Sequence, residues 1–196
     1  MAFKYAVALT GGIATGKSSA TMLLSLFGFR FIDADKITHA ILEQQHQKLI
    51  ELFGEEVITG GKVNRKAIGV VIFGNLEKKR SLEQLLHPLI YAEIERQSEV
   101  QDKFGKPYII DIPLFFETNR YPINRSMVVY TPIEKQLERL IKRDGFSKEE
   151  ALQRINAQMS IEEKKQKATY LIDNSGDLKA LQDECDRVKE AILADF

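Results

Sequence analysis

Short, continuously apolar runs recur along this chain, and between them apolar residues are spaced three or four positions apart. The continuous runs predict buried β-strands at residues 5–9, 29–32, 108–111, 126–130 and 170–173. The spaced pattern predicts helices, as on the C-terminal face formed by Leu178, Leu181, Cys185, Val188 and Ile192. Strands that alternate with helices predict an α/β fold, a five-stranded and mostly parallel sheet flanked by helices on both faces. In such a sheet, ligands bind beyond the carboxyl ends of the strands.

The part of the chain between the second and third strands is predicted to be mainly helical. A helical pattern covers residues 35–53, and the turn-rich residues 59–62 open the next helical section. Residues 81–84 resemble a capping box, which indicates a helix start. The proline of His87-Pro88 predicts a kink or a fresh helix start at that point.

Composition and charge exclude several classes of protein. The 196 residues suit one globular domain, and 28 basic and 28 acidic side chains give a formal net charge of zero. No global field therefore attracts the chain to nucleic acid or to a membrane surface. We find no apolar stretch of membrane-spanning length and no signal peptide, which predicts a cytoplasmic protein. Cys185 is the only cysteine and the 3 histidines are not spaced as metal ligands, so neither a disulfide nor a histidine metal site is expected.

Residues 11–18 match the phosphate-loop motif G-x-x-x-x-G-K-[ST] without a mismatch. A predicted strand precedes the motif and an apolar helical face follows it, so a chance match in a glycine-rich turn is the weaker alternative. In this geometry the loop amides hold phosphates, Lys17 reaches the β- and γ-phosphates, and the Ser18 hydroxyl can ligate Mg²⁺. The sequence therefore predicts that a nucleoside triphosphate and Mg²⁺ bind at Gly12, Ile13, Ala14, Thr15, Gly16, Lys17, Ser18 and Ser19.

Two aspartates follow predicted strands at the edge of the sheet where the phosphates are expected. Asp33 ends the second strand and Asp111 ends the third. An aspartate after the third strand commonly holds Mg²⁺, directly or through water, whereas one near the second strand can accept the proton of an attacking hydroxyl. The alternative for both is a helix N-cap or turn residue, for which aspartate is favoured. We interpret Asp35 as the cap, because it directly precedes the helical pattern that starts at Lys36.

A cationic segment follows the fourth strand. Residues 133–167 are charged and helical, and residues 135–170 hold nine Lys and Arg against six Asp and Glu, a net charge of +3. Arg139 and Arg143 are four residues apart on one helix face, and Arg154 follows on the next helix. This pattern is typical of a mobile lid whose arginines close onto a transferring phosphoryl group. The alternative is a solvated helical hairpin with ordinary ion pairs, which is favoured for any single lysine here.

Several segments together resemble the dephospho-CoA kinase family. They are Leu-Thr-Gly-Gly-Ile-Ala-Thr-Gly-Lys-Ser at 9–18, Phe-Ile-Asp-Ala-Asp at 31–35, Leu-His-Pro-Leu-Ile at 86–90, Asp-Ile-Pro-Leu-Phe-Phe-Glu at 111–117, and the stretches 136–143, 150–158 and 171–176. The phosphate loop alone indicates a superfamily, whereas the segments at 86–90 and 111–117 are much narrower. The resemblance implies an enzyme that uses ATP and Mg²⁺ to phosphorylate the ribose 3′-hydroxyl of dephospho-CoA, a small-molecule substrate, in the last step of coenzyme A synthesis.

The resemblance also implies an organisation and a set of roles. A single P-loop kinase domain, monomeric or weakly homo-oligomeric, has its core at about 1–35, 106–134 and 168–196, a helical substrate subdomain at about 36–105 and a lid at about 135–167. Lys17, Asp33, Arg139 and Arg143 are expected to be catalytic, with Asp33 as the base. The nucleotide side adds Arg154 and Asn174, the latter near adenine. The substrate side comprises Asp33, Arg65, His87, Pro88 and Asp111.

This chain departs from the family pattern at two positions. Ala14 stands where the loop usually has glycine, which is tolerable where that φ is negative. Asn64 stands where aspartate often precedes the arginine. Glu117 has no assigned role, and a structural salt bridge is one interpretation of it.

Two other functional classes compete with this interpretation. One is a different small-molecule kinase on the same core, such as a nucleoside or shikimate-like kinase. The other is a regulatory nucleotide switch or motor ATPase, in which triphosphate binding moves a partner. The lid-like arginines and the absence of a guanine-specifying N-K-x-D motif argue against the second class.

Overall fold

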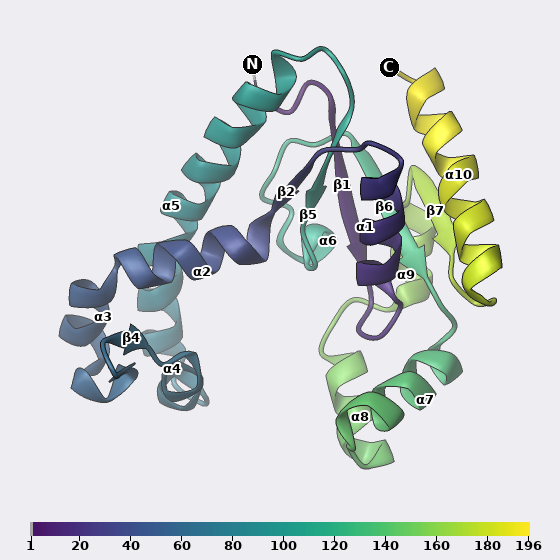
Figure 1. Ribbon diagram of the computed structural model, residues 1–196. Coiled ribbons are helices and arrows are strands. Elements are labelled where there is room, and N and C mark those ends of the chain that lie inside the picture. Colours follow the sequence, from purple (N-terminus) through teal and green to yellow (C-terminus); the bar gives the residue numbers. More distant parts are fainter. Residues whose placement is uncertain (1) are drawn as a thin grey trace. The chain divides into compact units, whose positions relative to one another are not determined.

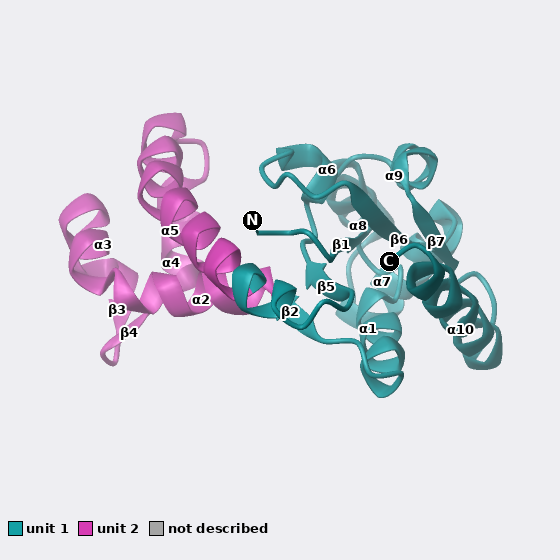
Figure 2. Cartoon of the chain, turned by 90° about the horizontal axis from the view of Figure 1, so that it is seen from above, with its two compact units in different colours: residues 1–32, 98–196 teal, residues 33–97 magenta. Residues whose placement is uncertain are grey.

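A computed structural model describes residues 2–196. The chain divides into two compact units, the first formed by residues up to Ile32 together with 98–196 and the second by residues 33–97 (Figure 2). Helix α5 (Leu76–Asp102) begins in the second unit and ends in the first. Within residues 2–196, no helix has both the length and the apolar content that crossing a bilayer requires.

A five-stranded sheet is the centre of the first unit, as the apolar runs predict (Figure 1). Its strands lie in the order β2 (Phe31–Asp33), β5 (Tyr108–Asp111), β1 (Ala6–Gly11), β6 (Arg125–Tyr130) and β7 (Tyr170–Asp173). β1 pairs in parallel with β5 and with β6, and β6 pairs in parallel with β7. The register sets Leu9 of β1 opposite Asp111 of β5. The carboxyl end of β5 therefore lies beside the end of β1, from which the phosphate loop starts.

Helices cover both faces of the sheet because consecutive strand side chains point to opposite sides. On one face, α1 (Lys17–Leu26) and α10 (Leu178–Ala194) pack against strand residues such as Val129. On the other face, Val128 and Tyr130 pack with Ile161 of α9 (Ile161–Lys167) and with Phe116 of α6 (Phe115–Thr118). This arrangement confirms the α/β fold class.

Cys185 is fully buried in the core formed by α1, α10 and the sheet, and burial raises the pKa of its thiol to about 11. Since the thiolate is the reactive form, we expect a thiol reagent at about pH 8 to label native protein only as fast as it unfolds. The measurement is labelling followed by mass spectrometry, with protein in denaturant as the control that shows one reactive thiol. Fast labelling of the folded protein would contradict this burial.

The second unit is mostly helical but differs from the predicted boundaries. The single helix predicted at 35–53 is divided at Gln45 into α2 (Ala34–Gln44) and α3 (His46–Phe53). The turn η1 (Glu55–Val57) leads into a hairpin of β3 (Ile58–Thr59) and β4 (Lys62–Val63), which the sequence analysis did not predict. Gly60 and Gly61 make its turn, with φ of 58° and 76°, a conformation that glycine adopts without strain. Helix α4 (Arg65–Ile72) follows.

Helix α5 is continuous through Pro88, so a fresh helix start at that residue is wrong. Pro88 and Gln84 are both on the exposed face, and the Gln84 carbonyl that Pro88 cannot satisfy is therefore accessible to water. The capping-box interpretation is also wrong, because the helix starts earlier. The side chain of Asn75 accepts the Lys78 N–H at 3.0 Å, and the Ser81 hydroxyl donates within the helix to the Glu77 carbonyl.

Candidate active site

The phosphate loop connects the end of β1 with the start of α1 (Figure 1). Gly16 occupies the N-cap position with φ of 84°, and no side chain caps the helix. The first amide groups of α1 therefore lack helical acceptors and can bind an anion at the positive end of the helix dipole. A Cβ atom at Gly12 would lie 2.6 Å from Gln136 Oε1, and one at Gly16 would lie 2.1 Å from Asn174 Nδ2. Neighbouring side chains therefore leave no room for a Cβ atom at either glycine.

Gly16→Ala is expected to lower nucleotide affinity at least tenfold. Alanine at this position must adopt a left-handed φ, and its Cβ collides with the Asn174 amide. Gly28→Ala is the matched control, since Gly28 has φ of 93° and its added Cβ meets nothing within 4 Å. The control should lose about 1 kcal/mol of stability and bind normally. Calorimetric titration with a non-hydrolysable ATP analogue checks both variants. Equal affinities for the two would show that the Gly16–Asn174 approach does not shape the site.

Ala14 has φ of 60°, so the condition of a negative φ at this position is not met. A left-handed alanine costs roughly 1–2 kcal/mol. Ala14 and Ile13 pack against a small apolar cluster of Leu140, Ala151 and Ile155 from the two helices that follow β6. The methyl contact offsets part of the backbone cost, which explains why alanine is accommodated in a loop position that favours glycine.

Lys17 and Asp111 are in direct contact. The Lys17 ammonium donates to both carboxylate oxygens of Asp111, and the two side chains are only 22% and 16% exposed. Leu9 and Asp111 are register partners on adjacent parallel strands, so the topology brings the end of β5 to the phosphate loop. The placement of Asp111 beside the loop lysine agrees with the sequence prediction.

Arg139 and Asn174 form a second group against the phosphate loop. Arg139 lies on α7 (Ile133–Asp144), and its guanidinium donates to the Asn174 carbonyl at 3.0 Å and to Thr131 Oγ1 at 3.3 Å. The Asn174 amide donates to the Thr15 carbonyl at 2.8 Å. Asn174 thus joins the end of β7 to the loop, and Arg139 is held at the same place.

Arg143 and Arg154 contact residues within their own helical pair. Arg143 makes a bidentate pair with Asp144 at 2.9 and 2.8 Å, which raises the pKa of the arginine and lowers that of Asp144. Arg154 lies on α8 (Lys148–Asn156), and its guanidinium stacks 4.2 Å from the Phe146 ring centroid. The three predicted lid arginines therefore have separate partners, and the structure does not gather them on one acceptor.

Three further polar residues support the loop, a role that their positions in the sequence do not indicate. Gln158 Oε1 accepts the Ile13 N–H at 3.0 Å, and the buried Gln136 amide donates to the Thr131 carbonyl at 2.7 Å. Lys164 is fully buried, so its interpretation as a solvated lysine of a hairpin is wrong. Lys164 pairs with Glu117 at 2.8 Å, which confirms the salt-bridge interpretation of Glu117. The contacts of Gln158 and Lys164 join residues more than forty positions apart, and helical spacing carries no signal for them.

In the second unit, Asp33 is the residue that caps α2. Its Oδ1 accepts the Lys36 N–H at 2.9 Å, and its Oδ2 lies 3.5 Å from the Lys36 ammonium. The interpretation of Asp35 as the cap is therefore wrong, since Asp35 lies in the first turn. β2 starts two residues later and ends one residue later than the predicted strand at 29–32, and α2 starts directly after it at Ala34, one residue earlier than predicted. The Asp33 side chain remains 35% exposed.

Arg65 begins α4, and the preceding Asn64 caps this helix by accepting the Ala67 N–H at 3.1 Å. The Arg65 guanidinium contacts His39 Nε2. A cationic surface pocket surrounds the arginine and is lined by Thr59, Lys62, Val63, Asn64, Arg65 and Lys66. His87 and Pro88 line a separate pocket on α5 together with Arg80, Glu83 and Gln84.

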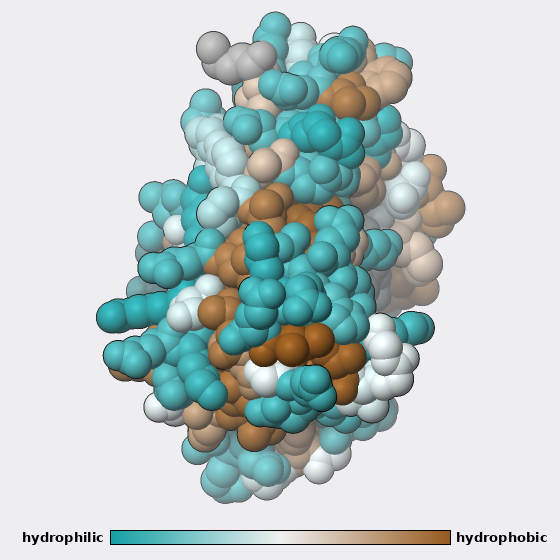
Figure 3. Space-filling view, turned by 90° about the vertical axis from the view of Figure 1, so that its left-hand side faces the viewer, coloured by the Kyte–Doolittle hydropathy of each residue, from teal (hydrophilic) through white to brown (hydrophobic). Residues whose placement is uncertain are grey.

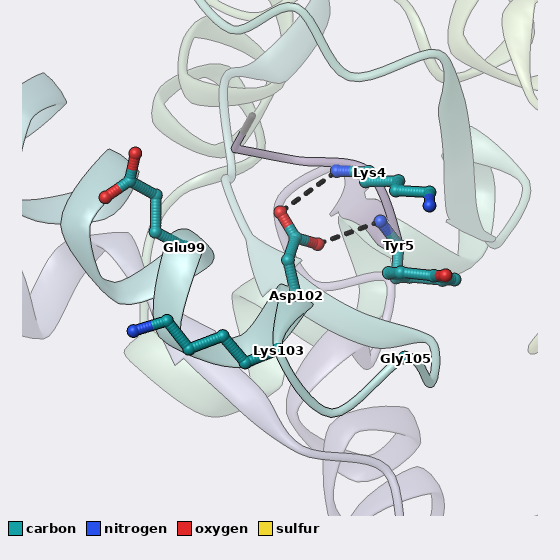
Figure 4. Close-up of a pocket in the computed structure, with 6 residues that line it drawn as sticks. All are labelled: Lys4, Tyr5, Glu99, Asp102, Lys103 and Gly105. Carbon is teal, nitrogen blue, oxygen red and sulfur yellow. Dashed lines mark hydrogen bonds between the residues drawn. The ribbon is translucent and has the colours of Figure 1, made fainter.

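A further pocket of the first unit lies at the amino end of β1, the end opposite the phosphate loop (Figure 4). There the Asp102 carboxylate accepts the N–H groups of Lys4 and Tyr5 at 3.1 and 3.0 Å. These bonds tie the end of α5 to the start of β1. The Asp102 carboxylate therefore anchors the fold at this end of the sheet. The pocket is separate from the candidate site.

Sequence comparisons with known proteins agree on one family. The sequence profile described as dephospho-CoA kinase matches residues 5–180. A dephospho-CoA kinase of Sulfurimonas denitrificans is 58% identical over 196 residues, which cover 100% of this chain and 98% of that protein. Among solved structures, the dephospho-CoA kinase from Campylobacter jejuni is 35% identical with a TM-score of 0.72, covering 98% of this chain and 100% of its own. The protein TT1252 from Thermus thermophilus is 31% identical with a TM-score of 0.80, covering 97% of both chains.

Proposed function

Since the chain belongs to the dephospho-CoA kinase family, we propose that it transfers the γ-phosphoryl group of ATP to the ribose 3′-hydroxyl of dephospho-CoA. The products are coenzyme A and ADP, and the reaction is the last step of coenzyme A synthesis. The observation that carries this proposal is the phosphate loop with Lys17 beside Asp111, in a chain that matches the family along most of its length. We expect the protein to act in the cytoplasm as a monomer or weak homo-oligomer, without nucleic acid or membrane partners.

On the nucleotide side, the chain supplies positioned charge. The amides of the phosphate loop bind the phosphates, and Lys17 neutralises oxygens of the β- and γ-phosphates. In the structure the Lys17 ammonium donates to both carboxylate oxygens of Asp111, and the third of its donors can bind a phosphate oxygen. Asn174 and Arg139 hold the loop at Thr15 and at the end of β7, which supports their proposed place at the nucleotide.

The residues near Lys17 fit a Mg²⁺ ion bound together with the nucleotide. Asp111 offers a carboxylate close to the loop and Ser18 offers a hydroxyl at the start of α1. Among the residues that the structure describes, no three His, Cys, Asp or Glu side chains gather as a metal cage, and Mg²⁺ commonly needs only one or two protein ligands beside phosphates and water. Bound there, the ion supplies charge neutralisation on the β- and γ-phosphates.

On the acceptor side, Asp33 is proposed to orient the 3′-hydroxyl and to accept its proton. The cap bond to the Lys36 N–H occupies Oδ1, and a carboxylate has further lone pairs for a hydroxyl. Arg65 and the lysines of its pocket offer positive charge for the diphosphate of the substrate. His87 and Pro88 are proposed to contact the same substrate.

The second unit also exposes apolar side chains, which suits a substrate that has apolar as well as anionic parts. Val70, Phe73 and Leu76 are 76%, 89% and 70% exposed. Figure 3 shows apolar areas interspersed with hydrophilic side chains on the face seen from the left of Figure 1. Arg139, Arg143 and Arg154 are proposed to stabilise the transferring phosphoryl group, and the Arg143 guanidinium keeps donors beyond the two that it gives to Asp144.

The dependence of ATP consumption on an added acceptor tests the proposed function. ADP release is followed with no acceptor, with dephospho-CoA, with adenosine and with shikimate. We expect ADP release only when dephospho-CoA is the added acceptor. Preference for adenosine or shikimate would transfer the function to another small-molecule kinase, and equal ADP release without any acceptor would indicate a nucleotide switch.

A further inference from the structure

Lys164 is a buried cation that no step of the proposed reaction uses. It lies in the middle of α9 with a side chain that is 0% exposed. Its ammonium donates to the Gly11 carbonyl at 3.0 Å, to the Pro113 carbonyl at 3.3 Å and to Glu117 at 2.8 Å. Since an ammonium has three donors, every N–H of Lys164 has an acceptor. A buried charge is tolerated when it is paired and hydrogen-bonded in this way.

The two carbonyl groups belong to the segments that carry Lys17 and Asp111. Gly11 is the last residue of β1 and the first residue of the phosphate loop. Pro113 lies two residues after Asp111, the last residue of β5. The hydroxyl of Thr10 also donates to the Pro113 carbonyl, at 2.7 Å. Lys164 therefore ties the backbone of the phosphate loop to the backbone of the segment that bears Asp111.

Glu117 is the counter-ion that holds Lys164 in place. It comes from α6, on the same face of the sheet as α9. Glu117 Oε1 also accepts the Met159 N–H at 3.1 Å, so the carboxylate fixes the chain just before α9 begins. The next residue back, Gln158, accepts the Ile13 N–H. The segment from Gln158 to Lys164 is thus attached to the phosphate loop at both ends.

We infer that Lys164 is a positioning residue for phosphoryl transfer, which sets the separation of the phosphate loop from Asp111 without touching the nucleotide. The inference rests on the proposed function for its activity readout. Its physical basis is that the protein must hold charged groups in place for this chemistry, and a misplacement of about 1 Å can cost 10²-fold in rate. A purely structural ion pair would affect unfolding and leave the folded enzyme unchanged.

Lys164→Met keeps most of the apolar stem and removes the three donors. We expect kcat per folded molecule to fall by about 10- to 100-fold and the affinity for an ATP analogue to fall as well, with the KM for dephospho-CoA unchanged. Lys167→Met is the matched control, because Lys167 ends the same helix and its side chain is exposed. The control should behave as the wild type in all three measurements.

The double variant Glu117→Gln, Lys164→Met separates positioning from stability. It removes both charges, so no carboxylate is left unpaired, and its melting temperature should recover toward the wild-type value. Activity and ATP-analogue affinity should stay low, because the bonds to Gly11 and Pro113 remain lost. Recovery of kcat and affinity together with stability would overturn the inference. Analogue binding needs no acceptor, so this readout stands even if the wild type fails to phosphorylate dephospho-CoA.

Discussion

Lys17→Ala is expected to lower kcat/KM for ATP by about 10³-fold or more, the scale of loss for a group that stabilises transition-state charge. Lys17 is the first residue of α1, and its ammonium is a point charge that already pairs with the Asp111 carboxylate. Removal of the ammonium leaves the γ-phosphate without a neutralising cation while the negative charge of the phosphate is redistributed during transfer. The expected loss lies mainly in kcat, because the charge is needed most in the transition state.

Steady-state kinetics with saturating dephospho-CoA measures this effect, after thermal unfolding has shown that the variant is folded. Lys179→Ala is a suitable control, since Lys179 also forms an ion pair, with Asp183, but is 73% exposed on α10. Exposed pairs of this kind contribute about 0–1 kcal/mol, so the control should be fully active. Near-normal turnover by Lys17→Ala would remove the phosphate-loop assignment.

Asp33→Asn is expected to lower kcat by about 10²–10⁴-fold, the usual contribution of a general base. Because a loose transition state needs little deprotonation of the nucleophile, the loss can lie near the lower end of this range. Asparagine caps helices as well as aspartate does, so the bond to the Lys36 N–H should persist. Stability and ATP affinity should therefore stay close to the wild-type values, which isolates the loss of the proton acceptor.

The matched control is Asp35→Asn, because Asp35 lies two residues away in the first turn of α2 and is exposed. Both variants are assayed for dephospho-CoA phosphorylation, and ATP binding is followed separately. If Asp33→Asn turns over within about threefold of the wild type at normal ATP affinity, far less than a general base contributes, Asp33 is only a helix cap.

The sheet was predictable because its strands are buried on both sides and therefore apolar throughout. β5 and β7 were predicted with their correct bounds, and β6 to within one residue. The phosphate loop was predictable because its function requires specific residues at fixed spacing. Local chemistry was a weaker guide elsewhere. The choice between Asp33 and Asp35 as the cap depended on the residue at which β2 ends. The hydrophobic pattern does not locate the end of a strand to a single residue.

Features that depend on tertiary contacts could not be predicted. Pro88 reads as a helix break, yet α5 continues because the unsatisfied carbonyl is on an exposed face. Lys164 sits among charged neighbours in a sequence that resembles a solvated helix, and only the fold brings it to Gly11, 153 residues away. The partners of Arg143 and Arg154 likewise lie within their own helical pair, a choice that residue spacing leaves open.

The destination of the γ-phosphate tests the proposed activity most directly. The protein is incubated with γ-labelled ATP, Mg²⁺ and dephospho-CoA, and the products are separated by chromatography and examined by phosphorus NMR. We predict that the label appears on the ribose 3′-oxygen, in a product that co-elutes with coenzyme A, with one ADP formed for each product molecule. Label found in inorganic phosphate, or at another position of the acceptor, would contradict the assignment.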